Sequence, residues 1–399
     1  MRRVVTGADK EGAAVPMVGP SLTDLADIEP GARRWLHGLP GLPRLRHWPQ
    51  LAKELGRLSR RAAERLGEVA RAAVLDPAMR LGIRPEPLLR VEPGGRSDPA
   101  RKGVALFVHF SPDGRISRMV RRQLETYDRL GFETVFLSNA PRIAEADWQE
   151  ARARVALAVH RRNFALDFGA WQDVAPLVLR RWPQAEELLL VNDSVLGPIR
   201  PLDPVFAAMR AAGPGVFGLL ESIQGGPHLQ SWFLLARGRE VVADLVAFLA
   251  ALRLSVSKWH VVQRGELRLA RAMRQRGHRV AAVYSYAALL ERALSDPAER
   301  AYLAAALPWL EPRRALPEAE AVAAMRLRLL RRPVNPARLF WRVLYGPAGC
   351  PLIKTELIRR NPGRLPGVEV WRELVPPDPP CPLPEIEAHL RLMGAAPAR

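Results

Sequence analysis

The pattern of apolar and polar positions divides the chain into a loose beginning, a regular middle and a helical end. Residues 1–47 are rich in Pro, Gly and Arg without sustained periodicity, which predicts a largely disordered segment. Over residues 48–76, apolar side chains recur every three or four positions and basic ones occupy the other faces, which predicts a basic amphipathic helix. This helix either lies on an anionic membrane surface or packs on its own domain. Residues 77–102 are expected to be a linker.

A regular succession of apolar strands and amphipathic helices begins at residue 103. The pattern predicts buried strands at 104–109, 133–138, 153–160, 187–191, 215–220 and 231–236, and helices at 116–130, 170–181 and 240–252. Strand, turn, helix and strand in this order are typical of a mostly parallel sheet. We therefore predict an α/β fold with a Rossmann-like central sheet, flanked by helices, over residues 103–290.

The end of the chain changes character again. Residues 291–375 predict a helical C-terminal module with a proline-rich interruption, and its part from 335 to 361 is expected to pack against the sheet. Residues 376–399 begin with PPDPPCPLP, which predicts an extended or disordered tail. The longest apolar run, 241–254, is shorter than the ~20 residues that span a bilayer, so no transmembrane helix is expected.

Composition and charge narrow the class of partner. The 399 residues are 48% hydrophobic, enough for a sizeable core, and 60 Lys and Arg against 41 Asp and Glu give a net charge of +19. No basic-aromatic or zinc pattern accompanies this charge, so nucleic acid is not expected as a partner. Residues 313–364 hold 12 basic and 3 acidic residues, which predicts a local basic surface facing a membrane or a lipid diphosphate. Its expected members are Arg326, Arg328, Arg331 and Arg332.

Cysteine usage and the N-terminus favour a cytoplasmic protein. Two cysteines, Cys350 and Cys381, are too few for a disulfide framework or a structural zinc site. The first residues are basic but have no apolar stretch behind them, unlike a secretory signal.

Polar residues follow several predicted strands. Ligands of open α/β sheets bind beyond the carboxyl ends of the strands, which points to His109 and Asp113 after the first strand. The triplet Asn192-Asp193-Ser194 emerges from the apolar strand at 187–191. Asp193 there either caps a turn or binds a divalent cation that neutralises a diphosphate.

Two further loops carry residues that suit sugar and nucleotide binding. Asn163 and Asp167 either hydrogen-bond a base or ribose or cap the following helix, near Trp171. In the segment ESIQGGPHLQSWF, three side chains suit sugar hydroxyls and stacking on a sugar face, although a surface hairpin also contains Gly and Pro. These three are His228, Gln230 and Trp232.

Glu266 opens a predicted helical run that ends at Gly277. A carboxylate in the first turn of a helix interacts favourably with the helix dipole and needs no catalytic role. The same carboxylate can serve as the general base that deprotonates an acceptor hydroxyl. Both interpretations remain open at this point.

Six separated blocks between about residues 104 and 374 resemble the rhamnan synthesis protein F family of bacterial polysaccharide assembly. The blocks are FVHFSPDGRI, SNAP, RRNFALDFGAW, ELLLVNDSVLGPI, HLQSWFLL and FWRVLYGPAGCPLIKTELIRRNP, in the family's order. That family is similar to GT-A glycosyltransferases of the family 2 type. The resemblance implies a GT-A-like catalytic domain over residues 103–290.

The resemblance also implies an activity. It implies inverting transfer of a sugar, L-rhamnose from dTDP-L-rhamnose, to a lipid-linked glycan acceptor at the inner face of the cytoplasmic membrane. Glu266 would be the base, and Asp193 would bind a divalent cation, Mg²⁺ or Mn²⁺, or the diphosphate itself. From their positions and side-chain chemistry, we expect His109, Asp113, Asn163, Asp167 and Asn192 to bind the nucleotide sugar together with Asp193, and Trp171, His228, Gln230 and Trp232 to bind the sugar or acceptor.

The sequence departs from that family's pattern in ways that keep alternatives open. The triplet at 192–194 has one carboxylate instead of two, and Arg264-Gly265 stands where an acidic residue often precedes the base. Metal dependence therefore stays open, and so does a non-catalytic polysaccharide-assembly protein with the same fold. Lys354, in the block PLIKTELIRRNP, either contacts a phosphate or forms a structural salt bridge.

Overall fold

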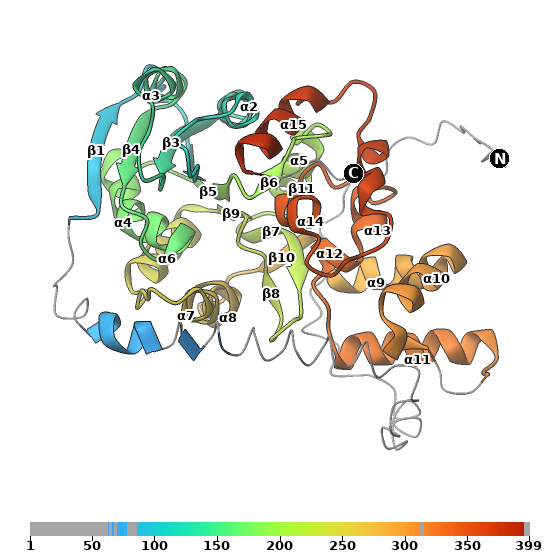
Figure 1. Ribbon diagram of the computed structural model, residues 1–399. Coiled ribbons are helices and arrows are strands. Elements are labelled where there is room, and N and C mark those ends of the chain that lie inside the picture. Colours follow the sequence, from blue (N-terminus) through green and yellow to red (C-terminus); the bar gives the residue numbers. More distant parts are fainter. Residues whose placement is uncertain (1–62, 64–65, 68–69, 78–85, 312–314, 395–399) are drawn as a thin grey trace.

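A nine-stranded sheet forms the centre of the protein in a computed structural model that describes residues 63, 66–67, 70–77, 86–311 and 315–394 (Figure 1). Its strands are β1 (Leu88–Pro93), β2 (Gly103–His109), β3 (Phe132–Ser138), β4 (Leu157–Arg161), β5 (Glu187–Asn192), β7 (Gly215–Ser222), β8 (His228–Leu229), β9 (Phe233–Arg237) and β10 (Val280–Tyr284). The order is β1-β4-β3-β2-β5-β9-β7-β10, and β8 pairs with β7. The predicted mostly parallel α/β sheet is confirmed.

Strand direction gives the sheet two distinct edges. The strands β2, β3, β4 and β5 are mutually parallel, and β10 runs parallel to β7. Because β9 lies antiparallel between β5 and β7, those two strands also point the same way. We call the edge where these parallel strands end the front edge, and the edge where they begin the rear edge.

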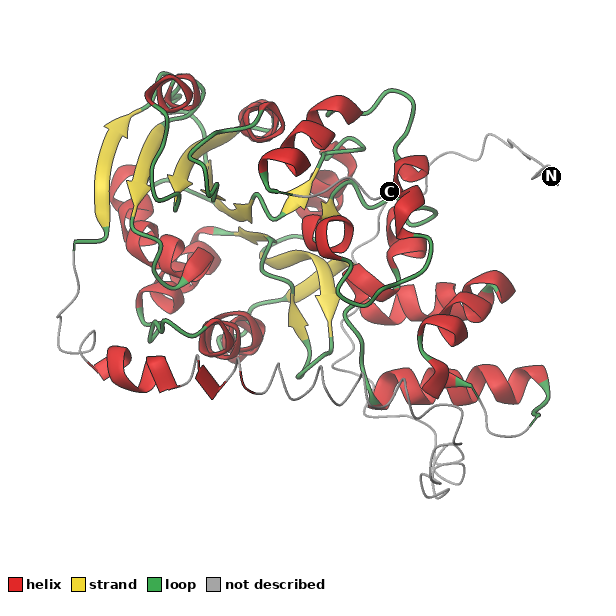
Figure 2. Ribbon diagram, in the orientation of Figure 1, coloured by secondary structure: helices red, strands yellow, loops and turns green. Residues whose placement is uncertain are grey.

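Helices cover both faces of the sheet (Figure 2). They are α2 (Arg118–Arg129), α3 (Glu145–Arg152), α4 (Leu166–Arg181), α5 (Asp203–Ala211), α6 (Arg239–Ala250), α7 (Lys258–Val261), α8 (Leu267–Gln275), α9 (Tyr286–Ser295), α10 (Pro297–Ala306), α11 (Glu318–Arg331), α12 (Pro336–Leu339), α13 (Trp341–Tyr345), α14 (Thr355–Arg360) and α15 (Leu383–Leu392). Side chains of β2 alternate between the two faces, so that Leu106 packs with α4, α6 and α8, and Phe107 packs with α2, α3 and α5. Covered faces explain why the strands are continuous apolar runs.

The C-terminal module is joined to the sheet domain by a small antiparallel ribbon. Strand β11 (Ile353–Lys354) pairs with β6 (Val195–Leu196), which directly follows the end of β5. Leu344, Leu352 and Leu357 belong to the same hydrophobic core as Phe107 of β2. The prediction that residues 335–361 pack against the sheet domain is confirmed.

Two segments predicted to be loose are ordered. Within the predicted linker, β1 adds an antiparallel edge strand, with Val91 opposite Val159 of β4. Within the predicted tail, α15 packs against α2, where the Arg122 guanidinium donates to Glu385 at 2.7 and 2.8 Å. The prediction of a linker at residues 88–93 and of a disordered tail at residues 383–392 is therefore wrong.

The described end of the predicted amphipathic helix lies against the sheet domain. Residues 70–77 are helical, with Ala72 and Asp76 buried, and Asp76 accepts a hydrogen bond from the Val256 amide at 3.3 Å. Val74 is exposed. Residues 1–47 and the start of this helix lie outside the described part of the chain. Among the helices that are described, none combines the length and apolar character needed to cross a membrane.

The arginines expected to share one basic surface are used in different contacts. Arg326 pairs with Glu291 of α9 at 2.6 Å, whereas Arg328 donates to the carbonyl oxygens of Leu310 and Glu311 at 2.7 and 2.8 Å. Positions two apart on a helix face in different directions. The expectation of a single shared basic surface is therefore not met, because these side chains stabilise the packing of α11.

Candidate functional site

A carboxyl group occupies the point on the front edge where the strand order reverses. The chain builds β3 and β4 on one side of β2 and then places β5 on the other, and ligands of open α/β sheets bind at such a switch point. Asp193 follows β5, and its amide donates to the Val108 carbonyl of β2 at 3.0 Å. Its Oδ2 accepts the Phe110 amide at 2.8 Å. Backbone groups of β2 thus fix Asp193 at the switch point.

Burial changes the protonation of Asp193 and its neighbour His109. Burial raises the pKa of Asp193 to about 8, an effect opposed by the Phe110 amide and reinforced by the charge of Asp167. Burial lowers the pKa of His109 to about 3, so its ring is neutral at neutral pH. The ring lies with Nδ1 3.0 Å from Ser138 Oγ and Nε2 4.0 Å from Asp193 Oδ2. The two groups therefore form no ion pair at neutral pH.

The other two members of the triplet belong to a hydrogen-bond chain that runs across the front edge. Lys354 Nζ donates to Ser194 Oγ at 2.8 Å, and Ser194 Oγ donates to Asn192 Oδ1. Asn192 Nδ2 then donates to Asp167 Oδ2 at 2.7 Å. Every donor points in the same direction, from an ammonium group toward a carboxylate. The chain connects β11, the end of β5 and the start of α4.

The loop before α4 holds Asp167 in place through a buried cation. The Arg161 guanidinium is fully buried and donates to Asn139 Oδ1 at 2.7 Å and to the Phe164 carbonyl at 3.0 Å. Ala165, two positions before Asp167, has a φ of 55°, in the left-handed region that non-glycine residues rarely adopt. Such backbone persists only where the surroundings impose it. The start of α4 is therefore fixed in one conformation.

Lys354 supplies positive charge among these carboxylates. Its ammonium lies 5.7 Å from the centre of the Trp232 ring, and its side chain is half-buried. Burial lowers the pKa of Lys354 to about 8, while the negative charges of Glu266 and Asp167 act to raise it. Among the described residues, Lys354 does not form the structural salt bridge that was one of its two alternatives. Its hydrogen-bond acceptor is the Ser194 hydroxyl.

Glu266 lies across from this chain and is hydrogen-bonded on both oxygens. Ser231 Oγ donates to Oε2 at 2.7 Å, and His228 Nε2 lies 3.4 Å from Oε1. His228 Nδ1 is 2.7 Å from the Gly226 carbonyl and must donate to it. The second ring nitrogen of His228 therefore faces the Glu266 carboxylate. Burial raises the pKa of Glu266, but His228, Ser231 and Lys354 lower it more, so the pKa lies below its usual value.

The backbone around Glu266 differs from the prediction. Glu266 does not open a helix, because helical structure starts at Lys258 and passes through a π-helical turn, Val262–Glu266, into α8. A Cβ on Gly265 would lie 2.8 Å from the Phe168 ring of α4, so only glycine permits this close packing. Mid-helix π turns are frequent at functional sites. The helix-dipole explanation for Glu266 loses its basis, since no helix begins there.

Two aromatic candidates have different environments. Trp232 is buried beside Lys354, and its indole donates to Gln230 Oε1 at 2.7 Å. Gln230 in turn donates to Asn335 Oδ1 at 3.2 Å, so the side chains of Gln230 and Trp232 stabilise the front edge. Trp171 lies fully buried in the core under α4, with its ring against Phe168. The prediction that Trp171 contacts a sugar is not supported, because its ring exposes no surface.

The remaining predicted residues lie at loops near the front edge. Asp113 accepts hydrogen bonds from Ser111 Oγ and the Arg115 amide, and so stabilises the turn after β2. Asn163 is exposed in the loop between β4 and α4. Asn163 and Asp113 thus lie in exposed loops. The structure brings the other nucleotide and sugar candidates together, apart from Trp171. The clustered candidates are His109, Asp167, Asn192, Asp193, His228, Gln230, Trp232 and Glu266.

The carboxylates of the front edge do not form a metal centre. Across the described ranges, no group of three or more His, Cys, Asp or Glu side chains is arranged to hold a metal ion. Mg²⁺ and Mn²⁺ need carboxylate oxygens that are free to bind them. Asp193 Oδ2 accepts the Phe110 amide, and Asp167 Oδ2 accepts the Asn192 amide. The described residues therefore offer no ready-made set of three protein ligands for Mg²⁺ or Mn²⁺.

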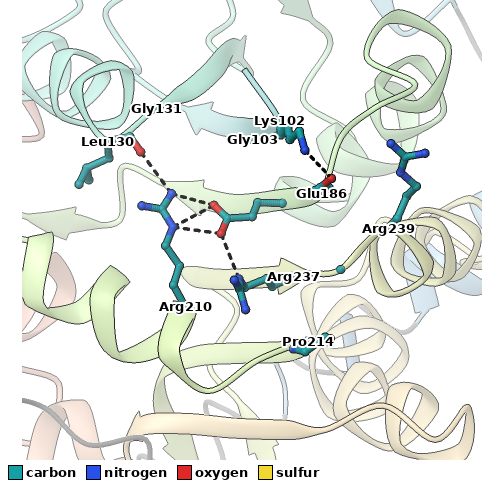
Figure 3. A pocket seen from close by; sticks show the side chains of 11 residues that line it. Lys102, Gly103, Leu130, Gly131, Glu186, Arg210, Pro214, Arg237 and Arg239 are labelled. Atoms are coloured by element: carbon teal, nitrogen blue, oxygen red, sulfur yellow. Dashed lines mark hydrogen bonds and ion pairs between the residues drawn. The ribbon is translucent and has the colours of Figure 1, made fainter. Parts of the chain in front are cut away.

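A cavity of about 550 Å³ opens at the rear edge (Figure 3). Glu187 lies between two guanidinium groups there, 2.7 Å from Arg210 Nη2 and 3.4 Å from Arg237 Nε. Lys102 pairs with Glu186 at 2.9 Å. Most charges that line the cavity are thus neutralised by partners on neighbouring strands and helices.

Three front-edge residues were not singled out from the sequence. Ser194 and Ser231 are hydrogen-bonding partners of Lys354 and Glu266, and Lys258 acts electrostatically on both Asp167 and Lys354. The serines carried no signal of their own. A signal for the lysines did exist, because only five of the chain's sixty basic residues are Lys and two of those five lie at the front edge.

Comparisons with known proteins add one relative of unassigned activity. No protein-family model matches the sequence. Among curated proteins, the uncharacterized protein y4gN of Sinorhizobium fredii (strain NBRC 101917 / NGR234) is 24% identical over 193 residues, which are 47% of this chain and 50% of that protein. The chain therefore spans about half the length of the curated relative it matches. The relative's name therefore assigns no activity to this chain.

Proposed function

We propose that the protein is an inverting glycosyltransferase with its active site at the front edge. The observation that carries this proposal is that an ionised base, Glu266, and a switch-point carboxyl, Asp193, on separate elements of an open α/β sheet both lie within the influence of the same charged group, Lys354. An acyl or phosphoryl transferase would need a nucleophile or a phosphate loop, and neither motif accompanies these residues in the sequence. A base facing a switch-point ligand suits transfer from a nucleotide sugar to a hydroxyl.

In the proposed step, an acceptor hydroxyl attacks the anomeric carbon of the donor. The new bond joins the acceptor oxygen to C1, and the bond between C1 and the phosphate oxygen breaks, leaving its electron pair on the nucleoside diphosphate. The hydroxyl proton passes to Glu266. Since base and leaving group act on opposite faces of the sugar, the configuration at C1 inverts.

His228 and Ser231 serve the base in this scheme. Their hydrogen bonds keep Glu266 ionised and aimed in one direction before the acceptor binds. Asp193 then contacts the donor at the switch point, and the buried Gln230 and Trp232 stabilise the front edge through their hydrogen bonds.

The donor, the acceptor and the place of action come from the resemblance to the rhamnan synthesis protein F family. That resemblance favours L-rhamnose from dTDP-L-rhamnose as the donor and a lipid-linked glycan as the acceptor. It also favours a GT-A-like identity for the sheet domain and peripheral contact with the inner face of the cytoplasmic membrane. The exposed Val74, on the described end of the basic helix, agrees with such contact.

A thermal-shift and transfer experiment tests this proposal. We expect dTDP-L-rhamnose to raise the melting temperature of the full chain more than UDP-glucose or GDP-mannose does. We also expect release of dTDP when an acceptor glycan is added. No stabilisation by any nucleotide sugar would contradict the proposal.

A non-catalytic polysaccharide-assembly protein is the second candidate, and the single carboxylate at 192–194 favours it. Such a protein would bind the nucleotide sugar, or a glycan, without turnover. Stabilisation by dTDP-L-rhamnose without dTDP release under any acceptor would identify it.

A further inference from the structure

We propose that Lys354 takes the place of a divalent cation and holds the diphosphate of the donor. This inference rests on the proposed function, because it concerns the leaving group of the same reaction. Lys354 reaches the front edge through the β6–β11 ribbon, on which it lies opposite Val195, two residues after Asp193.

The first step of the argument is the unfilled hydrogen-bonding capacity of the ammonium group. A lysine ammonium has three N–H donors. Among the described residues, Lys354 Nζ donates one hydrogen bond, to Ser194 Oγ at 2.8 Å. Within the described ranges, the charges of Asp167 and Glu266 act on this ammonium group without a hydrogen bond or ion pair to it. A half-buried cation with free donors is suited to an anionic ligand.

The second step is the position of this ammonium relative to the switch point. Lys354 Nζ binds the hydroxyl of Ser194, which is the residue next to Asp193 in the chain. A diphosphate placed beyond the end of β5 would lie beside both side chains. Lys258 adds a second positive charge, since it acts on Lys354 as well as on Asp167. The diphosphate would thus be attracted by the positive charges of two lysines.

The third step is the lack of a ready-made metal site among the front-edge carboxylates. Asp167 and Asp193 each have an oxygen committed to a protein donor, and no cluster of three or more metal ligands occurs over the described ranges. A diphosphate beside Ser194 would therefore find its positive charge on the Lys354 ammonium, which already contacts that residue.

Calorimetric titration of the full chain with dTDP and with inorganic pyrophosphate tests this proposal. Each probe is titrated in EDTA and in Mn²⁺, into the wild type, K354M, K354R and the rear-edge control K102M. We expect both probes to bind in EDTA, with Mn²⁺ changing the affinity by less than about twofold. We expect K354M to weaken binding by about one to two orders of magnitude, K354R to retain most of it, and K102M to leave it unchanged.

A second variant covers the case in which K354M does not fold, as judged by circular dichroism. S194A keeps the charge and removes the hydrogen bond that orients the ammonium group. We expect a smaller loss of affinity for both probes, about threefold to tenfold. In that case, unchanged binding of both probes in S194A would overturn the proposal.

The outcomes separate this inference from the proposed function. Binding of dTDP only in Mn²⁺, with K354M equal to wild type, overturns the role of Lys354 and leaves the glycosyltransferase proposal standing. Lys354-dependent binding of pyrophosphate, without binding of dTDP, UDP or GDP, supports the anion site and contradicts the glycosyltransferase proposal. Failure of every probe in both buffers overturns both.

Discussion

The two edges of the sheet carry similar residue types in opposite states. At the rear edge, Glu187 pairs with both Arg210 and Arg237 beside the cavity of about 550 Å³. At the front edge, Lys354 binds a hydroxyl instead of a carboxylate, and Asp193 accepts a backbone amide. Most charges at the rear edge have a counter-charge partner, whereas Lys354 at the front edge forms no ion pair with a described residue. On the proposed function a ligand completes the front edge, although the cavity of about 550 Å³ lies at the rear.

The largest effect is expected from removing Glu266, the proposed catalytic base of the front edge. We expect E266Q to lower the transfer rate by about 10²- to 10⁴-fold, because the amide cannot take the proton of the acceptor hydroxyl. The dissociation constant for dTDP should stay within about twofold of the wild type, since the amide keeps the hydrogen bond from Ser231. Steady-state rates and calorimetry measure these quantities. E186Q, at the rear edge, is the matched control, and near-normal turnover in E266Q would remove Glu266 from the mechanism.

A pH titration of dTDP binding separates the front edge from a generic basic surface. Burial lowers the pKa of Lys354 to about 8, so its charge is lost as the pH rises through 8, and binding should weaken by about tenfold per pH unit above that. The charged groups around it are Glu266, Asp167, Glu356 and Lys258.

Asp193 ionises in the same range and would also weaken binding. The variant K354R separates the two effects, because a guanidinium stays charged throughout. A much shallower fall in K354R supports the role of Lys354. Equal slopes in the two proteins would assign the pH dependence to Asp193.

At the rear edge, the expected effect of a substitution is on stability. E187Q removes the charge that Arg210 and Arg237 share, so we expect the free energy of unfolding to fall by about 1–2 kcal/mol. Urea unfolding followed by circular dichroism measures the loss. The transfer rate per folded molecule should be unchanged, and a loss of turnover in E187Q would show that the two edges are coupled.

The smallest effect is expected for the exposed rear-edge cation Arg239. It forms no ion pair with any described residue, and its substitution by alanine should change the free energy of unfolding by less than about 0.5 kcal/mol. Binding of dTDP should also be unaffected. Weaker dTDP binding in R239A would mean that the rear cavity takes part in ligand binding, and the contrast between the edges would fail.

The apolar pattern predicts the inner strands of the sheet well, but it predicts the outermost strand β1 and the helix α15 poorly. The apolar run at 104–109 differs from β2 by one residue, because a strand buried on both faces has a continuous apolar sequence. Strand β1 was missed since it is an edge strand, half-exposed and ending in Pro93, with the composition of a loop. Helix α15 was missed because prolines lead into it, and proline is compatible with the first turn of a helix.

The candidate site could be predicted where a polar side chain directly follows a buried strand. Asp193 follows a buried strand, so the general rule for open sheets locates it. The contact between Lys354 and Ser194 depends on pairing of two strands of two residues each, and no periodicity marks strands so short. The burial of Trp171 was not predictable either, because a helical aromatic residue faces the core or a ligand with the same sequence pattern.

The β6–β11 ribbon has a consequence for the order in which the protein is made. Synthesis proceeds from the N-terminus, so the whole central sheet, including Asp193 and Glu266, leaves the ribosome before Lys354 is added. A nascent chain that has completed β10 thus holds the acidic groups of the front edge without Lys354. On the proposed mechanism, the enzyme gains its full hold on the donor only after β11 has been translated, so translation of the C-terminal module controls when donor binding begins.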